Sequence, residues 1–189
     1  MHRHISAVIL GLIAIASLTA MGPAGEDRHC AALLVPSGPG AEPGANGTTE
    51  QDLGCYPTYA EALAAGSGGA ITVPEDAAPA TLTQSELDGA TADAITSVLI
   101  GTEYTSTSYN GSSKSYFASE TCSATVTWEV SYVGDAWNDD FESGKGFGSC
   151  DHNKKFTAKD FGGSILTCTP NCSDYGSFRN LISSLRWKD

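Results

Sequence analysis

The sequence predicts an all-β domain that begins near Ser97 and continues to the end of the chain. The runs "SVLIGTEYTSTSYNG", "SKSYFAS", "ATVTWEVSYVG" and "KKFTAKDFGGSILTC" are short and rich in Thr, Val, Tyr, Phe and Trp, and turn-forming residues separate them. This pattern is typical of short strands joined by frequent turns. No helical pattern alternates with the runs, which disfavours a parallel α/β architecture. We therefore expect residues 97–189 to form a β domain.

Residues 1–24 have the features of an export signal peptide. A cationic start, "MHRH", precedes the apolar run "ISAVILGLIAIASLTA", and small residues follow around a cleavage zone. The alternative is a single membrane anchor. The run is short for a span of roughly 20 residues, and no basic cluster follows it. We expect a secreted, extracellular protein that has no membrane attachment after cleavage.

We interpret residues 25–96 as an acidic linker or leader that contains short helices. The first half of this region is rich in Gly, Pro, Ala and Thr, a composition that buries little surface. A Thr followed three residues later by Glu is the spacing of a helix capping box. This spacing occurs twice, in the pairs Thr58 with Glu61 and Thr83 with Glu86. Gly66 is placed where the first of the two helices would end.

Six cysteines in a small exported chain predict disulfide bonds. Proximity in the sequence favours three pairs, although many pairings are open and the sequence cannot select one. A zinc site is disfavoured because there is no CxxC pair and the histidines are scattered. The favoured pairs are Cys30 with Cys55, Cys122 with Cys150, and Cys168 with Cys172.

The net charge of −12 limits the partners that the protein can attract by charge. The negative charge is concentrated in residues 21–100, where eleven acidic residues accompany a single Arg. Nucleic acids and anionic membranes repel such a chain. We expect the partner to be an extracellular protein or surface.

An internal repeat appears when the aromatic residues are aligned. "YTSTSYNG" and "FTAKDFGG" each place an aromatic residue, four residues, a second aromatic residue, one residue and a glycine. Such spacing suits a hairpin that folds back on itself, with glycine in a conformation that a Cβ would penalise. The residues in these positions are Tyr104, Tyr109 and Gly111 in the first copy, and Phe156, Phe161 and Gly163 in the second. Downstream of them lie "NDDFES" and "RNLISS" respectively.

These two elements, in this order and in two copies, resemble the βγ-crystallin family. The resemblance covers about 90 residues, from Ser97 to Lys188, and implies a double Greek-key sandwich. It is most similar to small secreted bacterial members, some of which resemble metalloprotease inhibitors. The last serine of each downstream element, Ser143 and Ser184, is expected to bond to the folded hairpin.

The resemblance also implies a calcium site shared by the two downstream elements. Calcium takes six to eight oxygen ligands in flexible geometry, so loops rich in Asp, Asn and Ser suit it. The alternative is that these are turn residues bonded to their own backbone. The ligands implied are Asn138, Asp139, the carbonyl of Asp140 and Glu142 in the first element, and Asn180, the carbonyl of Leu181 and Ser183 in the second.

Two departures from the family pattern weaken the calcium prediction. Glu142 replaces a hydroxyl residue, and Arg179 replaces an acidic or amide residue. A guanidinium repels a cation and offers no acceptor. We expect at least one site to be damaged, and we hypothesise that Arg179 pairs with Glu142 or Asp140 in place of the metal.

No catalytic motif is present, and three acids in one turn suit a solvated or metal-binding loop better than a glycosidase pair. Trp128, Trp137 and Trp187 are expected in the core or at the interface between the keys, and the alternative is an exposed platform for carbohydrate. The sequence thus favours a secreted, non-catalytic binding or structural protein with weak calcium binding. One alternative is a secreted peptidase inhibitor that acts through "CTPNC" or "GSCDHNKK", and its partner would be a secreted protease. Another is an antimicrobial or toxin-like protein on the same fold.

Overall fold

The computed structural model describes residues 27–38, 47–88 and 97–189. The predicted signal peptide, residues 1–24, lies outside the described residues. In the described part of the chain, no helix has the length and apolar content required to span a membrane.

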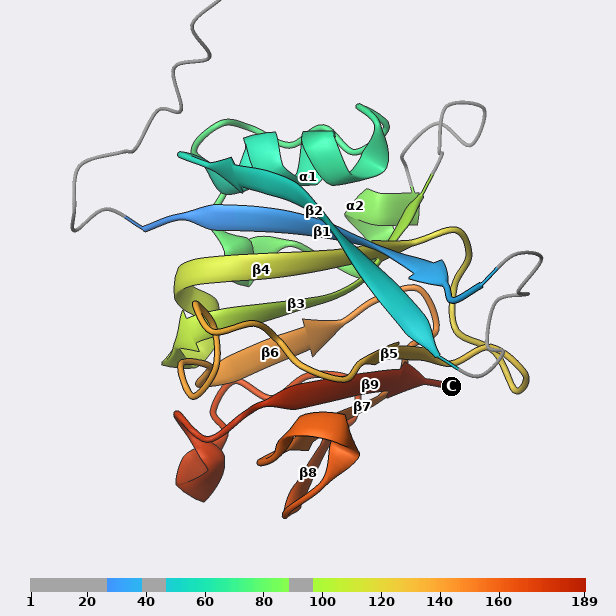
Figure 1. Ribbon diagram of the computed structural model, residues 1–189. Coiled ribbons are helices and arrows are strands. Elements are labelled where there is room, and N and C mark those ends of the chain that lie inside the picture. Colours follow the sequence, from blue (N-terminus) through green and yellow to red (C-terminus); the bar gives the residue numbers. More distant parts are fainter. Residues whose placement is uncertain (1–26, 39–46, 89–96) are drawn as a thin grey trace, which may run out of the picture.

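The described residues form two β-sheets packed face to face, with short helices at the periphery (Figure 1). The five-stranded sheet has the order β2-β1-β4-β3-β6, and the four-stranded sheet has the order β5-β9-β7-β8. The all-β prediction is therefore confirmed. The strands are β1 (His29–Pro36), β2 (Thr48–Tyr56), β3 (Val98–Ser106), β4 (Asn110–Ala118), β5 (Trp128–Val130), β6 (Ser143–Gly146), β7 (His152–Phe156), β8 (Ile165–Cys168) and β9 (Ser184–Lys188).

Strands β3 to β6 form a first Greek key, and residues from β7 to β9 form a second. The third segment of each key pairs with a strand of the other key. In the first key this segment is β5, which pairs with β9, and in the second key it contains Cys172, which forms a bridge with Gly144 in β6. This exchange makes the two keys share one core. The shared core contains Trp128, Phe141, Ile182, Leu185 and Trp187, each fully buried.

The interpretation of residues 25–96 as a linker is wrong for β1 and β2. Strand β1 pairs in parallel with β4 and antiparallel with β2, so it lies inside the five-stranded sheet. Its residues Cys30, Ala31, Ala32 and Leu34 are buried. The run "HCAALLVP" covers the edge of β4, which would otherwise present unpaired backbone groups. Glycine and proline on either side obscured this strand in the sequence.

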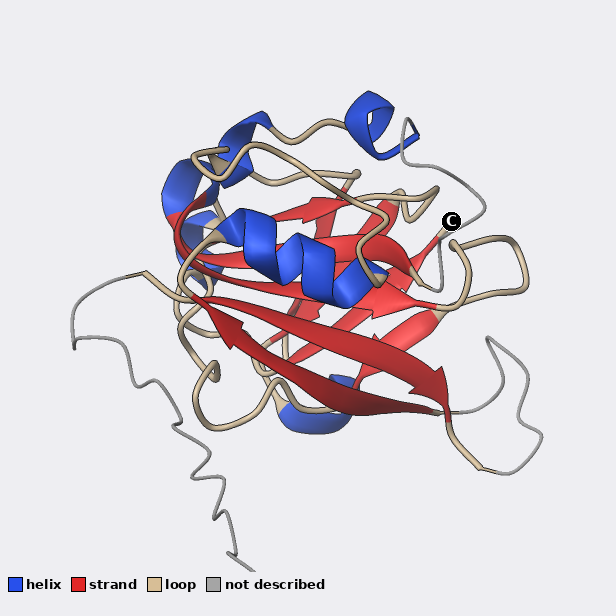
Figure 2. Cartoon of the chain, turned by 90° about the horizontal axis from the view of Figure 1, so that it is seen from above, coloured by secondary structure: helices blue, strands red, loops and turns tan. Residues whose placement is uncertain are grey.

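Helix α1 (Tyr59–Ser67) lies across one face of the five-stranded sheet, as Figure 2 shows from above. Its predicted capping box is present, with Thr58 and Glu61 exchanging hydrogen bonds. The helix does not end at Gly66 but continues to a left-handed Gly68. A Cβ on Gly66 would overlap the Phe117 ring, so the glycine permits close packing of helix on sheet. A second core forms there around Tyr59, Leu63 and Phe117.

The second predicted helix is present as α2 (Gln84–Asp88). Glu86 accepts a hydrogen bond from the Thr83 backbone N–H at 2.7 Å, as the capping spacing predicts. Short 3₁₀ turns complete the chain: η1 (Pro79–Thr81), η3 (Thr107–Tyr109), η4 (Lys159–Phe161) and η5 (Gly176–Phe178).

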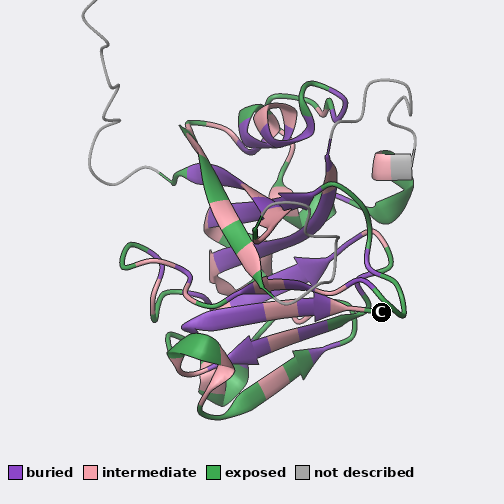
Figure 3. Cartoon of the chain, turned by 45° about the vertical axis from the view of Figure 1, so that its right-hand side comes forward, coloured by how far each residue is buried: buried purple, intermediate pink, exposed green. Residues whose placement is uncertain are grey.

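All three favoured disulfides form: Cys30 with Cys55, Cys122 with Cys150, and Cys168 with Cys172. The first joins β1 to β2, opposite each other in the register. The three tryptophans are also buried as predicted, with Trp128 and Trp187 fully enclosed and Trp137 at 6% exposure. Figure 3 shows that burial is concentrated on the inner strands, while β2 and β8 are exposed at the edges.

Candidate functional site

The two aromatic hairpins have nearly the same geometry. Tyr104 and Tyr109 meet edge to face with ring centroids 5.7 Å apart, and Phe156 and Phe161 do so at 5.6 Å. The glycine that follows each pair has a positive φ, 75° for Gly111 and 76° for Gly163. The second aromatic residue of each pair is also left-handed, because the strand folds back over the first ring. The sequence repeat is thus a repeat in three dimensions.

A serine from the end of each downstream element holds each hairpin. Ser143 Oγ accepts the backbone N–H of Tyr109 at 3.1 Å and donates to the Ser106 carbonyl at 2.6 Å. Ser184 Oγ repeats both bonds, to the N–H of Phe161 at 3.1 Å and the carbonyl of Ala158 at 2.7 Å. These bonds tie each hairpin to β6 or β9 without any metal.

The two calcium-type loops lie side by side and exchange backbone hydrogen bonds. The N–H of Asp139 donates to the Ile182 carbonyl at 3.1 Å, and the N–H of Asn180 donates to the Phe141 carbonyl at 3.1 Å. Asp139 and Asn180 occupy equivalent left-handed positions, with φ of 61° and 55°. The fold therefore brings together the two elements that the sequence separates by about 40 residues.

The side chains that the resemblance implies as ligands divide into two groups. Glu142 and Asn180 meet across the loops, where Asn180 Nδ2 donates to Glu142 Oε1 at 3.1 Å. Asn138 instead donates within its own loop, to Asp139 Oδ2 at 2.6 Å. Ser183 is buried, and its hydroxyl donates to the Thr157 carbonyl at 3.4 Å. Asp140 and Leu181, the two implied backbone ligands, are both exposed and each follows a turn.

Arg179 does not pair with Glu142 or Asp140, so the hypothesis of a substituting ion pair is wrong. Its guanidinium makes a two-point contact with Asp174, with Nε 2.7 Å from Oδ1 and Nη2 against Oδ2. Arg179 lowers the pKa of Asp174 to about 2, and the N–H of Gly176 adds to that effect. The sequence missed this partner because η5 folds the intervening residues into a tight turn.

The donor set of the paired loops suits a hard cation only in part. Among the described residues, no group of three or more His, Cys, Asp and Glu is arranged to hold a metal. The paired loops instead offer the Glu142 carboxylate, the Asn180 amide and backbone carbonyls, which are the oxygen types that calcium accepts. Within the part of the chain that the structure describes, the side-chain hydrogen bond that joins the two loops is that between Asn180 and Glu142.

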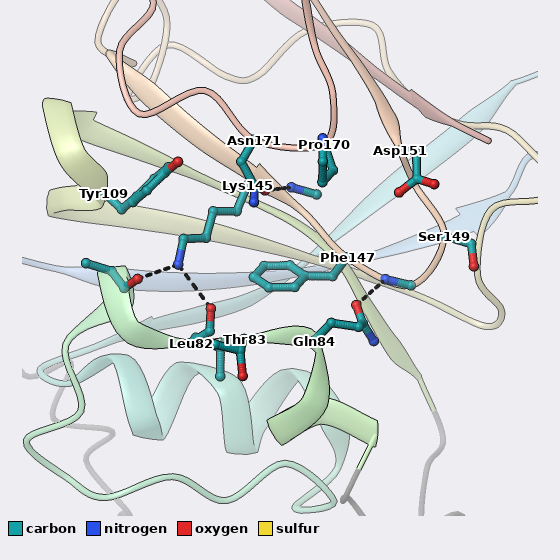
Figure 4. A pocket seen from close by; sticks show the side chains of 13 residues that line it. Leu82, Thr83, Gln84, Tyr109, Lys145, Phe147, Ser149, Asp151, Pro170 and Asn171 are labelled. Atoms are coloured by element: carbon teal, nitrogen blue, oxygen red, sulfur yellow. Dashed lines mark hydrogen bonds between the residues drawn. The ribbon is translucent and has the colours of Figure 1, made fainter.

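A second candidate site is a cavity of about 550 Å³. It lies between the segment before α2 and the loops that follow β6 and β8 (Figure 4). Tyr109, Phe147 and Pro170 supply apolar surface, and Asp151 and Asn171 supply polar groups. The cavity is bounded by both "GSCDHNKK" and "CTPNC", the two loops singled out as inhibitor candidates. No pattern in the sequence indicates that these loops meet.

Lys145 anchors the segment before α2 beside this cavity. Its Nζ donates to the carbonyls of Pro79 at 3.2 Å, Ala80 at 2.6 Å and Leu82 at 3.0 Å. The ammonium also lies 4.6 Å from the centroid of the Tyr109 ring. Burial lowers the pKa of Lys145, and Glu86 partly offsets this.

An ion pair that the sequence did not indicate is buried between the two sheets. Lys155 Nζ on β7 contacts Glu103 Oε1 on β3, and both side chains have 0% exposure. The Tyr175 hydroxyl donates to the other oxygen of Glu103. Burial raises the pKa of Glu103 and lowers the pKa of Lys155, and the attraction between the two groups partly offsets both shifts. Burial also raises the pKa of Tyr175 well above its usual value.

Comparison with known proteins gives structural matches alone. No protein-family model matches the chain, and no curated protein does either. The chain is similar to a βγ-crystallin from an archaeon, with 22% identity and a TM-score of 0.35, over 47% of this chain and 96% of that one. It is similar to a mutant βγ-crystallin domain from Clostridium beijerinckii, with 22% identity and a TM-score of 0.36, over 47% and 97% of the two chains. A βγ-crystallin domain from Flavobacterium johnsoniae matches with 18% identity and a TM-score of 0.35, over 47% and 92%.

Residues 97–189 have a βγ-crystallin-like fold. The two aromatic hairpins, the serines that hold them and the exchanged third segments are the features of this chain that define it. Strands β1 and β2 extend the first sheet of the βγ-crystallin-like domain, and helix α1 covers one face of that sheet.

Proposed function

We propose that this chain is a secreted, non-catalytic binding protein whose paired loops hold one weakly bound calcium ion. The observation that carries the calcium part is the contact between Glu142 and Asn180 across the two loops. It places a carboxylate and an amide at one point, within loops in which Asp140 and Leu181, the implied backbone ligands, are exposed residues. An amide oxygen and nitrogen exchange places by rotation of the side chain, so Asn180 can present oxygen there.

The ion pair of Arg179 with Asp174 supports a single site. The Asp174 carboxylate neutralises the guanidinium, which reduces the repulsion that Arg179 would exert on a cation. Arg179 still contributes no ligand, and the Ser183 hydroxyl is already engaged by Thr157. The second element therefore offers fewer oxygens than the first, and the affinity should be low.

Three disulfides support an extracellular role, because such bonds persist in oxidising compartments. They also stabilise the fold without metal. Calcium would then adjust the loops of a domain that is already folded.

A thermal melt with calcium and with chelator tests the proposal. A ligand that binds only the folded state stabilises it by about 2.7 kcal/mol at a hundred times its Kd. The melting temperature should rise with millimolar calcium, and titration calorimetry should give one site. Glu142→Ala should abolish the shift, whereas Glu75→Gln, an exposed acid outside the loops, should preserve it. An unchanged melting temperature, or two sites tighter than about 100 µM, would contradict a single weak site.

Peptidase inhibition is a second candidate, favoured by the rigidity of the "CTPNC" loop. The Cys168–Cys172 disulfide closes this loop, Asn171 Oδ1 accepts the Gly146 N–H at 3.1 Å, and the Pro170 carbonyl accepts Asn153 Nδ2 at 2.6 Å. A loop fixed in this way loses little entropy on binding. Inhibition of a secreted metalloprotease or serine protease, lost on Pro170→Gly, would support it, and a panel without inhibition would exclude it for the proteases tested.

A further inference from the structure

The pair formed by Glu103 and Lys155 is poorly suited to remain a simple salt bridge. An ammonium has three donors, and a fully buried ion pair is stabilised only if further hydrogen bonds satisfy it. Among the described residues, Lys155 Nζ has one hydrogen-bond acceptor, Glu103 Oε1. Its other neighbours are aromatic faces, with ring centroids 5.4 Å away for Trp187 and 5.9 Å for Tyr175.

The other buried lysines show how this fold satisfies an ammonium when it keeps one. Lys145 donates to three backbone carbonyls. Lys114 donates to Glu50 at 2.6 Å and to the Val133 carbonyl at 3.1 Å, and its partner Glu50 is 25% exposed. Lys155 has neither the extra acceptors nor the solvent contact.

We propose that Lys155 and Glu103 form an intramolecular amide bond that joins the two sheets covalently. The geometry required is present: the amine of Lys155 lies against the carboxyl group of Glu103, and the Tyr175 hydroxyl bonds to the second carboxyl oxygen. The backbone of Gly144 packs against the Glu103 carboxyl group and leaves no room for a side chain, since a Cβ there would lie 2.7 Å from Glu103 Oε2.

The reaction balances without any additional reagent. The lone pair of Lys155 Nζ attacks Cδ of Glu103 and forms the new C–N bond. One C–O bond of the carboxylic acid breaks, and its oxygen leaves as water with a proton from the amine. Tyr175 stabilises the negative charge that develops on the remaining oxygen, in the manner of an oxyanion-hole donor. Nothing is oxidised or reduced.

Three features of the site favour this condensation over hydrolysis. Groups held in contact react with effective concentrations of about 10⁵–10⁸ M, far above what free amines and acids reach in water. The core excludes water, which removes the competing reactant. Burial also raises the pKa of Glu103 and lowers the pKa of Lys155. Both shifts favour the neutral acid and the neutral amine, which are the reactive forms.

The intact mass of the full chain, reduced and denatured, tests the proposal directly. The wild type should be lighter than the mass that its sequence predicts by one water molecule. Lys155→Arg, processed in the same way, should have the full mass that its sequence predicts. Trypsin should cut after Lys114 but not after Lys155, and a branched peptide should contain Glu103. Lys114 is a matched control, because it also contacts a glutamate. A wild-type mass without this loss, with cleavage after Lys155, would overturn the proposal, and neither result requires a variant to fold.

Two variants sharpen the result. Glu103→Gln should lose ammonia and give the same amide, so its linked product should have the same mass as the linked wild type, and a mass that differs would refute the assigned bond. Tyr175→Phe should lower the linked fraction measured over time, and an unchanged fraction would remove Tyr175 from the reaction.

Discussion

The serines that hold the two hairpins give the sharpest prediction about stability. Replacing Ser143 with alanine removes an acceptor from the Tyr109 N–H and a donor from the Ser106 carbonyl, at 3.1 and 2.6 Å. Ser143 is fully buried, so water reaches these groups poorly. Each group left unsatisfied costs roughly 1–3 kcal/mol. Because the two bonds are only partly buried, we take the lower half of that range, about 1–2 kcal/mol for each group, and expect a total loss of about 2–4 kcal/mol.

Ser184→Ala should cost a similar amount, because Ser184 makes the same two bonds to the second hairpin at 3.1 and 2.7 Å. Denaturant unfolding measures both losses as shifts of the midpoint at constant slope. Ser177→Ala is the control, since Ser177 is exposed in η5 and should change stability by no more than about 0.5 kcal/mol. If both buried variants fell within the range of the control, the hairpins would not depend on these serines.

Three further outcomes are expected. Gly111→Ala should cost about 1–2 kcal/mol, since φ is 75° and the new Cβ would lie 2.7 Å from Thr105 Oγ1; an unchanged denaturation midpoint would contradict this. Trp187→Ala should cost about 3–5 kcal/mol, because the side chain is fully buried in the shared core, and a loss below about 1 kcal/mol would show that the core collapses around it. The pKa of Asp174 falls from 3.8 unfolded to about 2 folded, so its stabilisation is complete above pH 3.8 and is lost as the pH drops through about 2. Asp174→Asn should remove that contribution to the acid limb of a stability profile, and an unaltered limb would show that Arg179 does not hold the carboxylate.

Local patterns in the sequence determined most of the β domain. The aromatic spacing around Tyr104 and Phe156 predicted two hairpins, since it reports backbone conformations that only a folded-back strand requires. The resemblance to the βγ-crystallin family, which rests on the order of these elements, implied two Greek keys. Short separations between cysteines favoured the three disulfides that form, because nearby residues meet most often.

The tertiary structure decided the features that depend on distant residues. Strand β1 is a strand because β4 offers it an edge, so its composition alone suggested a linker. The cavity beside Lys145 and the contact of Glu103 with Lys155 arise from packing between segments far apart in the chain. Sequence patterns report local conformation, whereas burial and ionic partners are set only when the two sheets close on each other.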